Sequence, residues 1–444
     1  MNTKLTSWGQ YPVIESDLES FVFDEQLSPL VAKEDAFIPR GNGRSYGDSA
    51  LGKRAISTLK YDKILQFDTV NGIIECQPGI TLSDLLEVIV PEGWFLPVTP
   101  GTKLITVGGA VASNVHGKNH RSAGSFFNHI IDMDVRLASN ETLTCSTEQH
   151  ADLFEATCGG MGLTGMVTRV KFRLKKIETS FMKQKQVKAS NLNELLELFD
   201  KYHNYSYSVA WIDCLKKGEH FGRSILTVGE HAMLSELNED QKKIPLKLPA
   251  KKKLTFPVNL PSWALNKLTV KAFNFLYYTK NFRKQIDSVV LYDPFFYPLD
   301  AIDKWNRMYG KAGFVQYQFV LPLESKQGLA EILNRIGDKG MGSFLTVLKV
   351  LGKQESMISF CREGYTLALD FPLRKGVLEF LDELDPIVLK HGGRLYITKD
   401  ARMRPEMLAN YPQLDRFKEI IKKYNPEGKI RSAQSDRLHL TDNK

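Results

Sequence analysis

The 444-residue chain lacks any uninterrupted apolar run of the roughly 18 residues that a membrane-spanning helix needs. Its N-terminal residues also lack the apolar core of a secretory signal peptide. Both absences lead us to expect an intracellular protein. The hydrophobic content of 43% is ordinary for a folded protein, and the chain is long for a single core. We therefore expect two domains or one elaborated domain.

Cysteine is scarce and scattered along the chain. The five cysteines are odd in number and include no C-x-x-C pair, which argues against a disulfide framework and against a zinc site. His116 and His120 stand four residues apart, but Gly117 and Asn119 between them predict a loop rather than a helical pair of ligands. We therefore predict no metal site.

Acidic residues are absent from residues 241–286, which we call the basic segment. It carries eleven positive residues, more than the whole net charge of +8, so the rest of the chain is mildly acidic. Because this basicity is local and no nucleic-acid-binding module accompanies it, we expect no nucleic-acid partner. Four prolines should prevent long regular structure and make this segment the most mobile part of the chain: Pro245, Pro249, Pro257 and Pro261.

The first of three glycine-rich segments lacks the spacing of the common phosphate-binding motifs. Gly41, Gly43 and Gly47 fit neither G-x-G-x-x-G nor G-x-x-x-x-G-K-[ST]. Glycine nevertheless lets backbone N–H groups approach an anion closely. Two further segments, residues 100–120 and 159–165, are also rich in small residues. Three such loops in one N-terminal region predict a large nucleotide cofactor wrapped by backbone, without a Rossmann unit being required.

The hydrophobic pattern predicts short strands and few helices in the N-terminal half. Thr81 can cap a helix that carries Leu85, Leu86 and Val88. Residues 130–137 and 141–145 are typical of a hairpin. Other predicted elements are a helix at residues 192–201 and strands at residues 73–77, 166–174 and 206–213.

The region from residue 314 onward predicts the order β-α-β-β-α-β. Strands are expected at residues 314–321, 344–351, 365–371 and 394–399. Apolar residues at helical spacing predict the two intervening helices: Leu329, Ile332, Leu333 and Ile336, then Val377, Leu381 and Leu384. This order is that of a ferredoxin-like split unit, whose antiparallel sheet has one face covered by helices and the other free for a partner.

Three polar residues occupy positions in these strands where apolar residues are expected. Gln318 lies on the face of its strand opposite the fully apolar face. Lys349 shares a face with Leu345 and Val347. Lys399 ends the last predicted strand. A lysine among apolar neighbours must find a partner or shift its pKa, so we predict that the three residues converge on a polar ligand. The alternative is that the lysines lie on edge strands and point to solvent.

Together these segments resemble FAD-dependent oxidoreductases of the vanillyl-alcohol-oxidase type, and within them the decaprenylphosphoryl-β-D-ribose 2′-oxidase family. H-G-K-N-H at residues 116–120 and G-G-R-L-Y at residues 392–396 are specific to that branch. The other matching motifs are residues 43–48, 106–109, 122–125, 162–165, 316–319 and 370–372, with Lys399 and Asp400.

The resemblance implies an α+β, two-domain flavoprotein. Residues 1–178 and 394–444 would form the FAD domain, and residues 179–393 would form a substrate domain whose antiparallel sheet lies over the flavin. FAD would be non-covalent, because the first loop has no histidine to tether it. The implied FAD contacts are Arg40, Gly41, Asn42, Gly43, Arg44, Ser45, Tyr46, Gly47, Asp48, Ser49, Gly101, Thr106, Val107, Gly108, Gly109, Ser113, Asn114, Val115, His116, Val167 and Tyr396.

The implied reaction is oxidation of the 2′-hydroxyl of a polyprenylphosphoryl-β-D-ribose to the 2′-keto sugar, the first half of an epimerisation to the arabinose form. The flavin would perform the redox step and the protein would position and tune it. Lys399 would bind the reacting hydroxyl and the developing flavin anion. Lys349, Gln318 and His116 would orient the substrate or accept its proton, and which residue is the base stays open. Tyr46 packs near the flavin or is simply a buried loop residue.

The chain departs from the mycobacterial members of the family at two positions. Ala368 replaces a cysteine and Thr366 replaces an asparagine in the strand before Asp370. The redox mechanism does not need that cysteine, so function should survive. Inhibitors that bond to its thiol should fail here.

The resemblance also gives a reading of the basic segment. A polyprenyl-phosphate sugar lies at a membrane surface, and Lys251, Lys252 and Lys253 with Leu254, Phe256, Leu260 and Trp263 suit interfacial contact and a mobile lid. We expect a cytoplasmic protein with peripheral contact at the inner membrane and a short-chain reductase that acts on the keto product. A solvated loop is the alternative for this segment. For the whole chain, the alternatives are a flavin oxidase acting on a soluble alditol or sugar lactone, and a non-catalytic lipid- or anion-binding relative.

Overall fold

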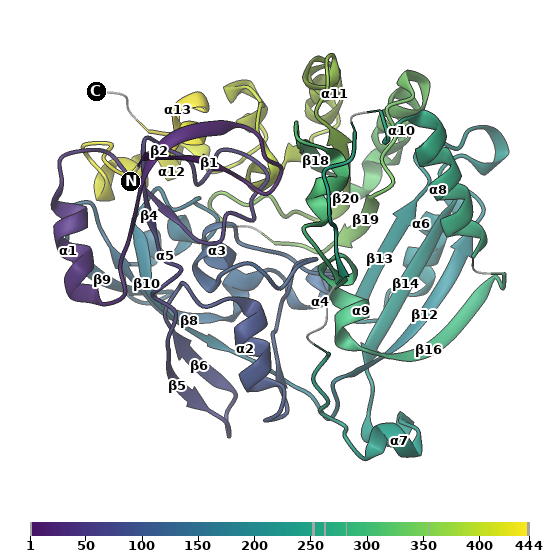
Figure 1. Cartoon of the computed structure of the whole chain (residues 1–444), viewed down its shortest axis with the longest axis horizontal. Helices are drawn as coiled ribbons and strands as arrows, with labels where there is room; N and C mark the ends of the chain where they lie inside the picture. The colour runs from purple at the N-terminus through teal and green to yellow at the C-terminus, as the bar shows by residue number, and fades with distance from the viewer. Residues whose placement is uncertain (1, 251–253, 262, 281, 355, 442–444) are drawn as a thin grey trace.

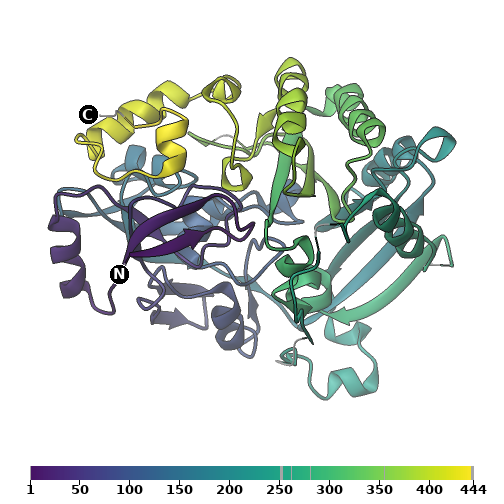
Figure 2. The same cartoon turned by 45° about the horizontal axis from the view of Figure 1, so that its top comes forward.

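The computed structural model describes residues 2–250, 254–261, 263–280, 282–354 and 356–441. Two lobes lie side by side (Figure 1). The first lobe contains residues 2–178 and 396–441, and the second lobe contains residues 179–395. Figure 2 shows the strands of the N-terminus and the helices of the C-terminus together in the first lobe. The fold is of the expected α+β class.

Two sheets form the core of the first lobe. The smaller sheet is mixed, with β2 and β3 both parallel to β4, in the order β1 (Asn2–Thr6), β2 (Val13–Ser20), β4 (Arg54–Ser57) and β3 (Ile38–Arg40). The larger sheet is antiparallel, in the order β5 (Ile64–Asp68), β6 (Ile73–Cys76), β10 (Met166–Arg173), β8 (Ile130–Arg136) and β9 (Thr142–Ser146). The hairpin and the two strands predicted here are confirmed.

The helices of the first lobe come from both ends of the chain. As predicted, Thr81 caps α2, where its hydroxyl accepts a hydrogen bond from the backbone N–H of Asp84 at 3.1 Å. The C-terminal helix α12 packs on α5, with Lys423 and Asp152 2.7 Å apart. These helices are α1 (Asp24–Ala32), α2 (Leu82–Ile89), α3 (Val107–Ala112), α4 (His120–Ala123), α5 (Ala151–Thr157), α12 (Leu414–Tyr424) and α13 (Ala433–Arg437).

An eight-stranded antiparallel sheet spans the second lobe. Its order is β16 (Gln285–Leu291), β12 (Phe181–Ala189), β14 (Ser224–His231), β13 (Tyr207–Ile212), β19 (Thr346–Leu351), β20 (Gly364–Pro372), β18 (Phe314–Leu321) and β21 (Arg394–Leu395). The order β19-β20-β18-β21 confirms the split unit predicted from residue 314 onward. The other half of the sheet also contains β12, β14 and β16, which the sequence pattern did not predict.

Helices cover one face of this sheet. Helices α10 (Lys326–Lys339) and α11 (Val377–Lys390) pack on β18, and α6 (Leu192–Lys201) packs on β12 and β14. The apolar residues that predicted α10 are all buried: Leu329, Ile332, Leu333 and Ile336. The opposite face is turned toward the first lobe.

Two predictions for the second lobe need correction. The last strand ends at Leu395, and Lys399 instead lies in a 3-10 turn, Ile397–Lys399, because the chain leaves the sheet there to enter the first lobe. The basic segment contains a 13-residue helix, α8 (Lys267–Thr279), although long regular structure was not expected. All four prolines precede Asn266, whose side chain caps this helix, so they do not interrupt it. Lys251, Lys252 and Lys253 lie outside the described residues.

Polar contacts tie the two lobes together near residues 99–103. Lys103 Nζ lies 2.7 Å from the carboxylate of Asp293, which belongs to α9 (Tyr292–Phe296). The side chain of Asp300 accepts hydrogen bonds from the Thr102 hydroxyl at 2.8 Å and from the Lys103 backbone N–H at 2.9 Å. These contacts bring the face of the large sheet that is opposite α6, α10 and α11 toward the glycine-rich loops of the first lobe, with α9 lying between them at one end.

Candidate active site

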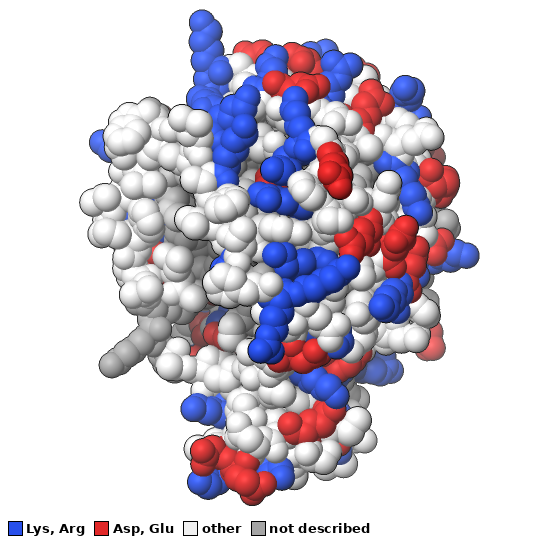
Figure 3. Space-filling model, turned by 90° about the vertical axis from the view of Figure 1, so that its right-hand side faces the viewer, with Lys and Arg blue, Asp and Glu red and all other residues white. Residues whose placement is uncertain are grey.

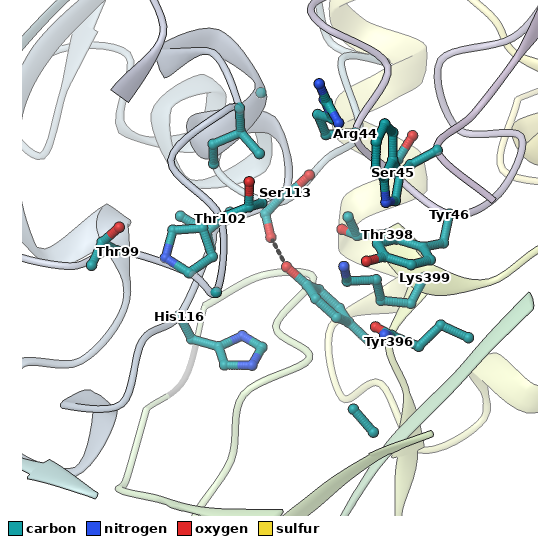
Figure 4. A pocket seen from close by; sticks show the side chains of 18 of the residues that line it. Arg44, Ser45, Tyr46, Thr99, Thr102, Ser113, His116, Tyr396, Thr398 and Lys399 are labelled. Carbon is teal, nitrogen blue, oxygen red and sulfur yellow. Dashed lines mark hydrogen bonds between the residues drawn. The ribbon is translucent and has the colours of Figure 1, made fainter. Parts of the chain in front are cut away.

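A cavity of about 450 Å³ lies between the lobes. One wall consists of the glycine-rich loops of the first lobe, and the other consists of side chains on the opposite face of the large sheet together with residues of α8 and α9, among them Tyr277, Phe295 and Phe296. Figure 4 shows Tyr46, Thr398, Lys399 and Tyr396 gathered at one side of the cavity, with His116 beyond Tyr396. The cavity therefore joins all the regions from which site residues were predicted.

The first glycine-rich loop contributes residues 40–46 and Ser49 to the cavity wall. Gly43 has a positive φ of 59°, a conformation that L side chains rarely adopt. Gly47 and Asp48, which were predicted to contact the cofactor, do not line the cavity. A Cβ atom on Gly47 would overlap the carbonyl oxygen of Asp400, and the Asp48 carboxylate is paired with Arg437. Both residues therefore contact the C-terminal part of the chain, on the side of the loop away from the cavity.

The second glycine-rich loop turns into α3 at the cavity wall. Its predicted residues Gly101, Thr106, Gly108, Gly109, Ser113, Val115 and His116 all line the cavity. Val107 and Asn114 do not, because Val107 is buried in the core and Asn114 Oδ1 accepts hydrogen bonds from the Ser125 hydroxyl and the Phe127 backbone N–H. A Cβ atom on Gly101 would meet no atom within 4 Å, so this glycine faces open space.

The third glycine-rich loop also reaches the cavity, although no site residue was assigned to it from the sequence. Met161, Gly162 and Gly165 line the wall, and the predicted Val167 follows them at the start of β10. Backbone from three separate glycine-rich loops thus surrounds one elongated space. A wall of closely approachable backbone, with Arg40 and Arg44 beside it, suits a large phosphate-bearing cofactor such as FAD.

Tyr396 and Lys399 join the cavity from the C-terminal part of the chain. The Tyr396 hydroxyl donates a hydrogen bond to the Ser113 carbonyl at 2.8 Å, which links the C-terminal turn to the second glycine-rich loop (Figure 4). Lys399 Nζ lies 3.7 Å from the centre of the Tyr46 ring. Tyr46 is buried and packs edge-on against Phe314. Lys399 and Tyr46 therefore form one contact at the cavity wall.

Gln318 connects His116 to the large sheet. Its amide nitrogen lies 3.3 Å from His116 Nε2 and 3.2 Å from the Thr366 hydroxyl. Burial, with Lys349 nearby, holds the pKa of His116 well below its usual range, so the ring is neutral. Because the amide N–H donates to Nε2, the ring proton lies on Nδ1, which has no hydrogen-bond partner among the described residues. His116 therefore has an unpaired but buried N–H group beside the cavity.

Buried charges gather on the sheet side of the cavity. Burial lowers the pKa of Lys349 to about 8, and burial also lowers the pKa of Lys399, opposed by the charge of Asp370. Burial raises the pKa of Asp370, whose oxygens accept hydrogen bonds from Gln316 at 2.5 Å and from the Tyr309 hydroxyl at 3.3 Å. Gln318, Lys349 and Lys399 thus lie around one cavity, and neither lysine points to bulk solvent from an edge strand.

Lys118 is a cavity residue that the sequence reasoning missed, although it stands inside the H-G-K-N-H motif. Its ammonium group lies 4.6 Å from the centre of the Phe295 ring and donates to the Phe295 carbonyl. Burial lowers its pKa to about 7. Other missed residues extend the wall along the sheet: Gln184, Gln186, Val209, Trp211 and Thr227. Val209 and Trp211 lie on the predicted strand β13, whereas the other three lie on β12 and β14, which were not predicted.

A large apolar surface borders the second lobe at the basic segment. The most exposed apolar side chains of the basic segment are Leu254 (77%), Trp263 (75%), Leu268 (76%) and Phe282 (96%). Figure 3, which faces the side of the molecule that carries α8, shows clustered Lys and Arg side chains beside a broad surface with few charged side chains among the described residues. No helix within the described ranges is long and apolar enough to cross a membrane.

Comparisons with known proteins cover both the cofactor region and the whole chain. A family model described as an FAD binding domain matches residues 28–146, which include the first two glycine-rich loops. Decaprenylphosphoryl-beta-D-ribose oxidase of Mycolicibacterium smegmatis is 37% identical over 412 residues, 91% of this chain and 89% of that protein. An uncharacterised protein in the mprA 5′ region of Streptomyces coelicolor is 31% identical over 81% of this chain and 100% of its own. A putative D-arabinono-1,4-lactone oxidase of Neurospora crassa is 30% identical, but over 26% of this chain and 20% of its own.

Proposed function

The chain belongs to the decaprenylphosphoryl-β-D-ribose oxidase family of FAD-dependent oxidoreductases, and we propose that it oxidises the 2′-hydroxyl of a polyprenylphosphoryl-β-D-ribose to the 2′-keto sugar. The observation that carries this proposal is the convergence of Lys349, Lys399 and the Gln318–His116 pair on one cavity, opposite three glycine-rich loops. The similarity extends over both lobes, so it includes the substrate side of the cavity as well as the cofactor side.

Oxidation of the alcohol breaks the C2′–H bond and the O2′–H bond and forms a carbonyl. Bound FAD supplies the acceptor for the hydride. The residues of the chain must therefore hold the sugar, accept the hydroxyl proton and stabilise the charge that develops. We assign these tasks to Lys399, Lys349, His116 and Gln318, which all line the cavity.

Lys399 is the residue we place at the reacting hydroxyl. Because burial lowers its pKa, the neutral form that can accept a proton is more accessible than in an ordinary lysine, while the charged form can stabilise an anion. His116 has a different task, because the Gln318 amide already occupies its Nε2 lone pair. Its free Nδ1–H suits orientation of a sugar oxygen. Gln318 in turn fixes the His116 ring.

We further propose that the wall residues of the three glycine-rich loops contact FAD without a covalent bond. The first loop offers Arg44, Ser45 and Tyr46 to the cavity and no histidine. We also assign residues 1–178 and 394–444 to the FAD domain and residues 179–393 to the substrate domain. The large sheet begins at Phe181, which supports the first boundary; its last short strand, Arg394–Leu395, still pairs with β18 although it falls just inside the second part of the assigned FAD domain.

The exposed apolar side chains and the lysines near α8 support peripheral contact with a membrane surface, where a polyprenyl-phosphate substrate is found. We therefore propose that the protein is cytoplasmic and binds peripherally to the inner membrane. The oxidation yields a 2′-keto sugar, so completion of an epimerisation requires a reductase that delivers hydride to the opposite face of that carbonyl. We propose a short-chain reductase for this second half.

Two measurements test the proposal. The purified protein should be yellow, and it should turn over a polyprenylphosphoryl ribose but not a free alditol or a sugar lactone. A yellow protein that prefers a lactone would support the soluble-substrate alternative, which the partial similarity to a lactone oxidase favours. A colourless protein that cannot be loaded with FAD would reject the enzyme altogether.

The assignment of Lys399 is tested by Lys399→Met. Turnover should fall by about 100-fold or more, as expected when a proton-accepting group is lost, while FAD stays bound. Lys422→Met, which changes an exposed lysine of α12, is the control and should keep wild-type turnover. Retention of turnover within a few fold in Lys399→Met would contradict the assignment.

A further inference from the structure

Arg437 of α13 joins two segments that are far apart in the sequence. One η nitrogen lies 2.7 Å from Asp48 Oδ1 and 2.8 Å from Asp400 Oδ2, and Nε lies 3.1 Å from Asp48 Oδ2. The other η nitrogen donates to the Met403 carbonyl at 2.5 Å. We propose that Arg437 is a positioning residue, which clamps the first glycine-rich loop to the turn that carries Lys399.

The two carboxylates need this guanidinium in order to stay close together. Asp48 is 4% exposed and Asp400 is 7% exposed, so the two buried like charges would otherwise repel each other. The second oxygen of Asp400 is held by the backbone N–H groups of Arg402 and Met403, at 3.0 and 2.7 Å. Because guanidinium is planar and has several donors, it fixes the relative orientation of both acids.

The clamped segments are in direct backbone contact. The Tyr46 N–H donates to the Thr398 carbonyl at 3.1 Å, and Gly47 leaves no room for a Cβ atom beside the Asp400 carbonyl. The Lys399 N–H donates to the Tyr396 carbonyl at 2.8 Å, which closes the turn. A shift of either segment would therefore change the contact between Lys399 Nζ and the Tyr46 ring at the cavity wall.

Helix α13 reaches the same turn a second time. Gln434 Nε2 donates to the Ile397 carbonyl at 2.8 Å, and Ser432 caps the helix by accepting a hydrogen bond from the Ser435 backbone N–H at 3.1 Å. Arg437 does not line the cavity, so it acts through Asp48 and Asp400 rather than on a ligand. This inference rests on FAD binding in the cavity and not on the identity of the sugar.

Arg169 offers a matched control for a test. It also bridges two aspartates, Asp132 at 2.7 Å and Asp134 at 2.8 Å, and its side chain is 19% exposed against 25% for Arg437. It lies on β10 of the same lobe but does not line the cavity. Arg169→Met and Arg437→Met should both lower Tm, because each leaves two aspartates without their cation.

The two variants should differ in the properties of bound FAD, measured well below both melting temperatures. Arg437→Met should raise the Kd for FAD by about tenfold or more and shift the flavin reduction potential to a more negative value, because Lys399 is displaced. Arg169→Met should keep both at wild-type values. Arg437→Lys keeps the charge but loses the planar fork, so it should restore Tm more than it restores Kd or potential.

Equal Kd and potential in Arg437→Met and Arg169→Met would overturn the inference, whatever their stabilities. If Arg437→Met does not fold, Arg437→Lys decides, and wild-type Kd and potential in that variant would also overturn it. If the wild-type protein binds FAD but does not oxidise a polyprenylphosphoryl ribose, the proposed substrate fails while this test remains valid.

Discussion

Lys349 lies on β19 beside the cavity, and burial lowers its pKa to about 8 from the ordinary 10.5. Below about pH 8 the side chain is charged in both the folded and the unfolded chain, and the folded protein bears the full cost of that charge. Between pH 8 and 10.5 the folded protein releases the proton first, so the free energy of unfolding should rise with pH. This pH dependence of the free energy of unfolding is opposite in sign to that of a lysine whose pKa is raised by an acidic partner.

Lys349→Met should therefore stabilise FAD-free protein at pH 7, by up to about 3 kcal/mol. The difference in Tm between variant and wild type should shrink as the pH approaches 10.5. Thermal unfolding at pH 7, 8.5 and 10 measures this. A constant difference across that range would show that the pKa of Lys349 is not lowered.

Ala368 allows a test by chemical modification. It lines the cavity at the position where the family resemblance implies a cysteine in mycobacterial members, and the five cysteines of this chain are all buried. Wild-type protein should gain no mass when incubated with an inhibitor that bonds to that thiol, whereas Ala368→Cys should gain one inhibitor mass. Intact-protein mass spectrometry measures both, and an adduct on the wild-type protein would contradict the prediction.

Motifs in the sequence located the wall of the cavity but not the direction in which each side chain points. The segment containing Gly43 does line the cavity, while Gly47 and Asp48 at its end face the C-terminal turn. Their contacts come from Asp400 and Arg437, which lie 353 and 389 residues later, and no local pattern contains that information. Lys118 was passed over for a similar reason, since its partner Phe295 belongs to the other lobe.

Among the elements, those with a clear apolar period were predicted, whereas the polar strand β12 and the apolar but non-alternating strand β14 were not. Strand β18 alternates strongly, because one face packs on α11 and the other meets the cavity. Strand β12 reads as polar on both faces. Its glutamines Gln184 and Gln186 line the cavity, while Lys183 pairs with Glu236 at the surface. Because polar residues of this strand face the cavity on one side and the surface on the other, its sequence shows little alternation of apolar and polar residues.

Helix α8 is the element on which the membrane proposal can be tested. Leu268 and Leu276 are 76% and 66% exposed on it, so charged replacements should leave the fold intact. The double variant Leu268→Glu, Leu276→Glu should lose most of its co-sedimentation with anionic vesicles, because apolar burial is lost and negative charge is added. Val70→Glu changes an 81% exposed residue of the first lobe and is the control. Equal sedimentation of both variants would reject α8 as the contact.

At the level of the whole molecule, the cavity exists because two lobes are held at a fixed distance. Lys103 is 8% exposed, and its pairing with Asp293 crosses the boundary between them. Lys103→Met should lower stability by about 1–3 kcal/mol and raise KM for the sugar more than it lowers kcat, because the lobes close less completely. Lys423→Met breaks the Lys423–Asp152 pair inside one lobe, so it should leave KM unchanged. Unchanged KM in both variants would contradict the role of the lobe contact.

The split construction of the first lobe sets an order for biosynthesis. A ribosome that has translated the first 393 residues has made every strand of the eight-stranded sheet except β21, but has not yet made Tyr396, Lys399 or Arg437. The nascent chain can therefore fold its second lobe before all residues of the first lobe have been made. Capture of the flavin becomes a late, post-translational event, and premature termination within the last few dozen codons should release a well-structured but colourless polypeptide.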